Sequence, residues 1–154
     1  MRPAIRFGVL ATCVLVQAAS ASAALAPWDQ AKVTDLAKQL ATVTSDLSNS
    51  FRKQPVPTKG SPQRQSHFLL TRQLRDIRRS ADALSSALQA GGDRKATLAR
   101  YQSLMQRVRT ARDHARRITA GTEVTQKADA ARDILNKMAP FYDANAAPMA
   151  PVQR

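Results

Sequence analysis

Apolar residues recur along this chain at alternating steps of three and four positions in four separate blocks. The blocks extend over residues 33–51, 67–88, 101–118 and 124–142. This spacing places one narrow apolar stripe on each of four amphipathic helices. Because each helix must bury its stripe against other helices, the pattern predicts an all-α protein that folds as an antiparallel up-down-up-down four-helix bundle.

Each apolar stripe, which we call a seam, supplies candidate core residues. The first seam comprises Val33, Leu36, Leu40, Val43 and Leu47, and it continues to Ser50 beside Phe51. The second comprises His67, Leu70, Leu74, Ile77, Ala81, Leu84 and Leu88. The third comprises Tyr101, Leu104, Val108, Ala111, Ala115 and Ile118, and the fourth comprises Val124, Ala128, Ala131, Leu135, Met138 and Tyr142.

Residues that begin and end helices separate the four blocks. Ser61 precedes a proline at the first helical position, and Gly91-Gly92-Asp93 combines a glycine stop with the next N-cap. Gly121 and Thr122 mark the third join in the same way. Such short joins require antiparallel neighbours, whereas residues 53–60 are expected to form a longer surface loop.

The N-terminus has the pattern of a secretory signal peptide. Arg2 and Arg6 give a positive start, an apolar run follows over residues 8–19, and Ala21-Ser22-Ala23 provides small residues for signal peptidase. The apolar run is shorter than a bilayer span requires. We therefore expect residues 1–23 to be cleaved, and the mature protein to be periplasmic or secreted with no transmembrane span.

The mature chain is expected to be one domain. Removal of the signal peptide leaves roughly 130 residues, enough for a single core, and also removes Cys13, the chain's one cysteine. Residues 24–143 are assigned to the bundle. Residues 144–154, which include Pro148 and Pro151, are predicted to be a disordered tail.

The sequence offers no catalytic motif. It lacks a glycine-rich phosphate loop, a haem-attachment Cys-x-x-Cys-His, a His-Glu-x-x-His and a nucleophile elbow. The chain contains two histidines, and the mature part contains no cysteine, so catalytic side chains are scarce. We expect a protein without catalytic activity and without a bound cofactor.

The two histidines form the alternative to that expectation. His67 and His114 lie nearly the same number of residues before and after Gly91, so a turn there would bring them to similar heights on adjacent helices. Helical bundles hold metal ions and haem between facing helices, which makes this pair a candidate metal site. In the competing interpretation, His67 closes the end of the core and His114 is solvated. Four-helix cytochromes that bind haem through a methionine of the first helix and a histidine of the last share only the architecture with this chain.

Arginine dominates the charge of the second and third predicted helices. The chain has a formal net charge of +13 at pH 7, and such a surplus favours anionic partners. The candidate anion-binding or partner-binding residues are Arg72, Arg75, Arg79, Arg100, Arg107, Arg109, Arg112 and Arg116. In the alternative interpretation these residues form a solvated surface with local ion pairs, such as that of Arg72 with Asp76.

Export determines which anions are available as partners. Nucleic acid is disfavoured as a partner because the protein is expected to be exported. The basic helices also lack the interleaved aromatic residues that stack on single strands. An acidic protein, a lipid headgroup or a polysaccharide of the envelope is expected instead. The segment Leu70-Thr71-Arg72-Gln73 resembles a shortened form of the Leu-Thr-x-x-Gln motif of the Spy and CpxP periplasmic chaperones. The resemblance covers four residues, and it implies a chaperone-like binding or scaffolding role.

Overall fold

The computed structural model describes residues 25–143 and residue 149. The predicted signal peptide, residues 1–23, lies outside the described residues, as does the predicted tail apart from Met149. Over the described part of the chain the protein consists of four α-helices. They are α1 (Gln30–Arg52), α2 (Pro62–Gln89), α3 (Arg94–Ala115) and α4 (Thr122–Tyr142).

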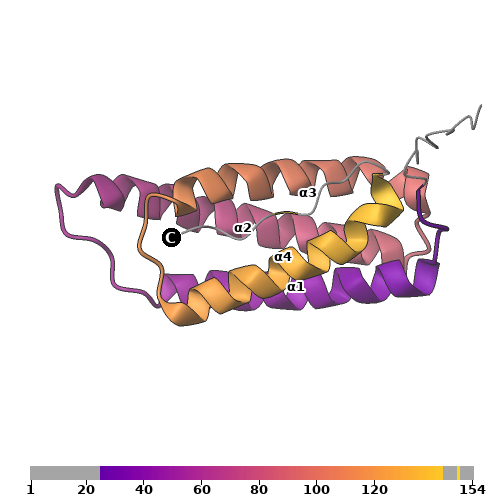
Figure 1. The fold of residues 1–154 in the computed structure, drawn as a ribbon, viewed down its shortest axis with the longest axis horizontal. Helices are drawn as coiled ribbons and strands as arrows, with labels where there is room; N and C mark the ends of the chain where they lie inside the picture. The colour runs from indigo at the N-terminus through magenta and orange to yellow at the C-terminus, as the bar shows by residue number, and fades with distance from the viewer. Residues whose placement is uncertain (1–24, 144–148, 150–154) are drawn as a thin grey trace, which may run out of the picture.

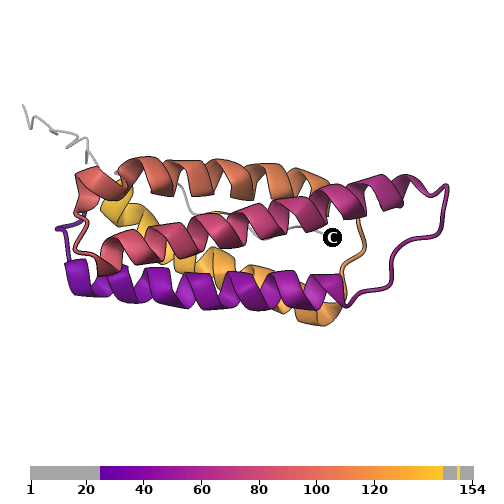
Figure 2. The same ribbon diagram turned by 180° about the vertical axis from the view of Figure 1, so that it is seen from behind.

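The four helices confirm the predicted all-α fold. Successive helices run in opposite directions along one long axis, as Figures 1 and 2 show. Helix α2 packs against α1 and α3, and α4 packs mainly against α1. Among the described helices, none is long and apolar enough to cross a membrane.

The predicted helix starts are confirmed by their capping bonds. The Ser61 hydroxyl accepts a hydrogen bond from the backbone N–H of Gln63 at 3.2 Å, and the Asp93 carboxylate accepts one from the backbone N–H of Ala96 at 2.8 Å. Gly91 adopts φ 84°, the left-handed conformation that ends a helix at a glycine.

The third helix ends earlier than its seam predicts. Helix α3 stops at Ala115, and Ile118 lies in the following connection. The N–H groups of Arg117 and Ile118 donate to the carbonyls three residues before them, both at 3.1 Å. Hydrogen bonds to the third residue before are common at the C-terminus of an α-helix. Ile118 therefore lies in a tighter turn that follows the helix.

The core consists largely of the predicted seam residues. Every member of the second seam is buried, including Leu84 at 0% exposure. Leu40, Leu104 and Met138 are also 0% exposed and represent the other three helices. Leucine and methionine side chains of this size contribute about 1.5–3 kcal/mol each when they leave water, so these contacts dominate the stability of the bundle.

One end of α4 is fixed to α3 by aromatic and hydrogen-bonded contacts. The Tyr101 and Tyr142 rings stack with centroids 4.2 Å apart, and the Thr97 and Tyr142 hydroxyls share a 2.9 Å hydrogen bond. We call Thr97, Tyr101 and Tyr142 the tyrosine clamp. Trp28 packs edge-on against Tyr142, and Arg94 lies over the Trp28 ring. The segment before α1 therefore helps to close this end of the bundle.

The other end of α4 is fixed to α1. Ser50 donates a 2.8 Å hydrogen bond to Glu123, and Lys127 donates to both the Ser50 hydroxyl and the Glu123 carboxylate, at 2.6 and 2.7 Å. These hydrogen bonds hold the pKa of the Glu123 carboxyl below its usual value. We call Ser50, Glu123 and Lys127 the polar bridge. Figure 1 shows the result: α4 crosses the bundle diagonally, meeting α3 at one end and lying against α1 at the other.

The tyrosine clamp predicts a loss of stability at alkaline pH. Burial, together with the nearby Asp143 carboxylate, raises the pKa of Tyr101 from 10.0 to about 12. The unfolded chain therefore loses this proton first, and the free energy of unfolding falls as pH rises from about 10 to about 12. The slope from this one group is about 1.4 kcal/mol per pH unit.

Alkaline denaturation of Tyr101→Phe tests that prediction. The variant should lose stability less steeply than the wild-type protein over this range, because phenylalanine has no proton to lose. Equal slopes would mean that Tyr101 titrates alike in the folded and unfolded states.

Candidate functional site

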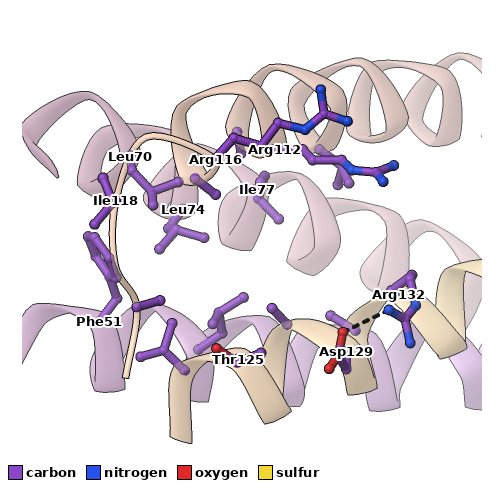
Figure 3. Close-up of a pocket in the computed structure, with 18 of the residues that line it drawn as sticks. Phe51, Leu70, Leu74, Ile77, Arg112, Arg116, Ile118, Thr125, Asp129 and Arg132 are labelled. Atoms are coloured by element: carbon purple, nitrogen blue, oxygen red, sulfur yellow. Dashed lines mark hydrogen bonds and ion pairs between the residues drawn. The ribbon is translucent and has the colours of Figure 1, made fainter. Parts of the chain in front are cut away.

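A cleft of about 570 Å³ lies between α3 and α4, at the end of the bundle away from the tyrosine clamp. Its floor is formed by apolar side chains of α1 and α2, which include Phe51, Leu70, Leu74 and Ile77. One wall is formed by Val108, Ala111 and Ala115 of α3, and the other by Ala128, Ala131 and Leu135 of α4. Figure 3 shows the floor residues between the two helices.

The walls of the cleft are seam residues that do not meet. Val108, Ala115, Ile118 and Ala128 belong to the third and fourth seams, yet each is only half-buried. The contacts between α3 and α4 are few, and the alanine side chains of the walls are too short to fill the space between helices fixed to different neighbours. The cleft is therefore the part of the predicted core that the bundle leaves unfilled.

The free-energy cost of a sealed apolar space of this size indicates that the cleft is open to solvent. A sealed apolar void costs about 24 cal/mol per Å³, so a sealed void of 570 Å³ would cost on the order of 10 kcal/mol. That is as large as the whole stability of a typical domain. The half-buried wall residues are in keeping with a cleft that opens to solvent and can admit a ligand.

Arginines gather along the α3 side of the opening. Arg112, Arg116 and Arg117 all line the cleft, and Figure 3 shows Arg112 and Arg116 above the apolar floor. Arg116 and Arg117 are exposed, and neither makes an ion pair with a residue that the structure describes. Cations at the C-terminus of a helix are also stabilised by the helix dipole, which accounts for their position on α3.

The α4 side of the opening carries one arginine that pairs with two aspartates. Arg132 donates to Asp129 at 2.7 Å and to Asp133 at 3.0 Å. Asp129 is the one carboxylate among the residues that line the cleft. Because arginines outnumber this one carboxylate in the cleft lining, the potential at the opening is positive.

Of the eight arginines predicted to bind a partner, two line the cleft and six do not. Arg112 and Arg116 border the cleft. Of the rest, Arg107 is half-buried, 3.8 Å from Asp76 of α2. The expected ion pair of Arg72 with Asp76 does not form among the described residues. The remaining five are exposed on α2 and α3 outside the cleft lining: Arg72, Arg75, Arg79, Arg100 and Arg109.

Sequence reasoning missed Arg117 and Arg132 as lining residues. The third seam predicts a helix that includes Arg117, but α3 ends at Ala115. The helical spacing therefore does not give the direction of the Arg117 side chain. Arg132 lies in the acidic fourth helix, where it pairs with Asp129 and Asp133, so net charge did not point to it. The signal that could have pointed to them is their position beside seam residues, since Arg117 precedes Ile118 and Arg132 follows Ala131.

His67 lies among aromatic rings. It is 6% exposed, its ring stacks on Phe51 with centroids 4.8 Å apart, and Phe68 packs edge-on against it. Neither ring nitrogen has a hydrogen-bond partner among the described residues. His114 is half-buried near the end of α3.

A metal site at the histidines stays a prediction. In the described part of the chain, no group of three or more histidine, cysteine or acidic side chains is placed to hold a metal ion. A two-histidine site of His67 and His114 is not tested by that finding.

The residues of the chaperone-like segment serve the helix and its core. Leu70 is buried and lines the cleft floor, and the Thr71 hydroxyl donates to the His67 carbonyl at 2.8 Å. The neighbouring Phe68 and Leu69 are 52% and 37% exposed. The segment therefore lies next to a small exposed apolar patch on α2.

Comparison of this chain with protein-family models, with curated proteins and with solved structures finds no match. The geometry of the cleft and its arginines is therefore the basis for any functional proposal.

The environment of His67 predicts that this histidine destabilises the fold. Two buried nitrogens without partners cost free energy, on the order of 1–3 kcal/mol per group. Phenylalanine keeps the stacking surface and removes both nitrogens, so His67→Phe should raise the melting temperature. A metal role predicts otherwise: zinc would stabilise the wild-type protein but not the variant. A lower melting temperature for the variant without added metal would show that the ring nitrogens contribute to the fold.

Proposed function

We propose that this protein is an exported, non-catalytic binding protein that captures an anionic component of the cell envelope at the opening of the α3–α4 cleft. One observation carries the proposal: Arg112, Arg116 and Arg117 all line an open, largely apolar cleft. The signal-peptide pattern of residues 1–23 supports export. A headgroup, an acidic protein and a charged polysaccharide share the anionic group that such a site would bind.

Arginine suits this role chemically. Its planar guanidinium presents several N–H donors in a fixed arrangement that matches the oxygens of a carboxylate or phosphate. Because Arg116 and Arg117 are exposed and unpaired among the described residues, they can bind an anion without first breaking an ion pair. The chain's net charge of +13, which becomes +11 when Arg2 and Arg6 are removed with the signal peptide, adds a long-range attraction that brings anions to the surface.

The groups in the cleft favour binding over catalysis. Thr125 and Asp129 are the polar residues that α4 contributes besides Arg132, and Arg132 holds the Asp129 carboxylate at 2.7 Å. A general base or a nucleophile needs a second group that activates it. The Thr125 hydroxyl instead donates to the Gly121 carbonyl at 3.2 Å, and the Asp129 carboxylate is engaged by Arg132.

A pair of charge-matched variants tests the proposal. Arg116→Gln with Arg117→Gln removes two charges at the cleft, and Arg72→Gln with Arg79→Gln removes two exposed charges from α2. Binding to phosphatidylglycerol vesicles at low salt should fall at least tenfold in the first variant, because hydrogen bonds to charged groups contribute about 1.5–3 kcal/mol. The second variant should lose much less.

Neutral phosphatidylcholine vesicles serve as the control for apolar adsorption. Equal losses in the two variants would mean that net charge alone attracts the membrane. The proposal of a specific site at the cleft would then be wrong.

A further inference from the structure

The cleft combines an apolar interior with charge at one edge. The floor and both walls are formed mainly by leucine, isoleucine, valine, phenylalanine and alanine side chains, with a few polar residues such as Thr44 and Gln63. Arg116 and Arg117, which make no ion pair with a residue that the structure describes, directly follow the last residue of α3, at the connection to α4. A ligand that satisfies both regions needs an apolar body and an anionic group at one end.

The size of the cleft fits a small molecule. Its volume of about 570 Å³ lies within the range of about 300–1,000 Å³ that is typical of ligand sites. The tyrosine clamp closes α3 against α4 at the opposite end, so the exposed apolar walls do not extend over the whole length of the two helices. A partner helix would need a groove that continues along the bundle, whereas a flexible chain can end inside a cleft.

We propose that the cleft binds a single-chain anionic amphiphile, an alkyl chain that ends in a carboxylate or phosphate. This inference rests on the proposed function and adds the chain to it. The anionic group binds Arg116 and Arg117, and the chain lies between the α3 and α4 walls over Leu70 and Leu74. The orientation follows from Figure 3, in which Leu70, Leu74 and Ile118 lie next to one another beneath the end of α3.

The Met149 side chain occupies part of the cleft, and the alkyl chain of the ligand would displace it. It lies in the cleft lining, and its backbone N–H donates to the side-chain oxygen of Asn136 on α4 at 2.9 Å. Methionine is flexible and fits irregular apolar space, so one thioether chain covers part of the cleft without filling it. The ligand chain and the Met149 side chain compete for the same apolar surface, and Met149→Ala should therefore tighten binding.

Calorimetric titration with octanoate, decanoate and dodecanoate below their micelle concentrations tests the inference. Because burial of each methylene is favourable, affinity should rise roughly fourfold per methylene until the cleft is full. Dodecyl phosphate should bind as dodecanoate does if the shared anionic chemistry is what counts. Dodecyl maltoside, which has the same chain and no charge, should bind much more weakly.

Two cleft variants with matched controls locate the binding. Ala115→Leu and Ala128→Leu place extra side-chain atoms between the walls and should lower dodecanoate affinity at least tenfold, with the melting temperature unchanged or raised. Ala83→Leu and Ala99→Leu, exposed on α2 and α3, should change nothing.

The outcomes separate this inference from the proposed function. Affinity that does not change with chain length, or cleft variants that bind as the wild-type protein does, would overturn the amphiphile while leaving the arginine site standing. Dodecanoate affinity that is unchanged in Arg116→Gln with Arg117→Gln would overturn the proposed anion site, and with it the assigned orientation. A titration in which Met149→Ala weakens binding would contradict the competition between Met149 and the ligand.

Discussion

The arrangement of this bundle depends on the two different neighbours to which α4 is fixed. Its C-terminal end stacks on α3 through the tyrosine clamp, and its N-terminal end is hydrogen-bonded to α1 through the polar bridge. A helix that is held in this way diverges from α3 between its two ends, and the contacts between α3 and α4 are few. The cleft is the consequence of that divergence, and the alanines of its walls are too small to compensate for it.

The same geometry brings charge and apolar surface together. Because α3 ends at Ala115, the following arginines lie at the edge of the cleft instead of continuing around a helix. They are favourable there on the grounds of the helix dipole alone. Once the cleft is open beside them, they also give it a cationic edge, and a bundle with an otherwise ordinary core gains a site suited to an amphipathic anion. The other exposed arginines of α2 and α3, such as Arg72 and Arg109, do not line this cleft.

The fold could be predicted from the sequence because it depends on local and repetitive features. The second seam, from His67 to Leu88, is buried throughout, and Ser61 and Asp93 cap helices as their positions indicate. The cleft could not be predicted, because seam periodicity states which face of a helix is apolar and not whether two faces meet. Ala115 and Ala128 satisfy the pattern equally well in a closed or an open bundle. The bonds that keep the bundle open join Ser50 to Glu123 and Thr97 to Tyr142, and such long-range pairs of polar residues have no sequence signature.

Nuclear Overhauser effects in the ligand-free protein test the central claim most directly, since they report which side chains of α3 and α4 lie in contact. The account predicts strong effects between the rings of Tyr101 and Tyr142, and none between the methyl groups of Ala115 on α3 and Ala128 on α4. Cross-peaks between those two methyl groups would show that the helices close along their whole length. The cleft, and the binding role built on it, would then be contradicted.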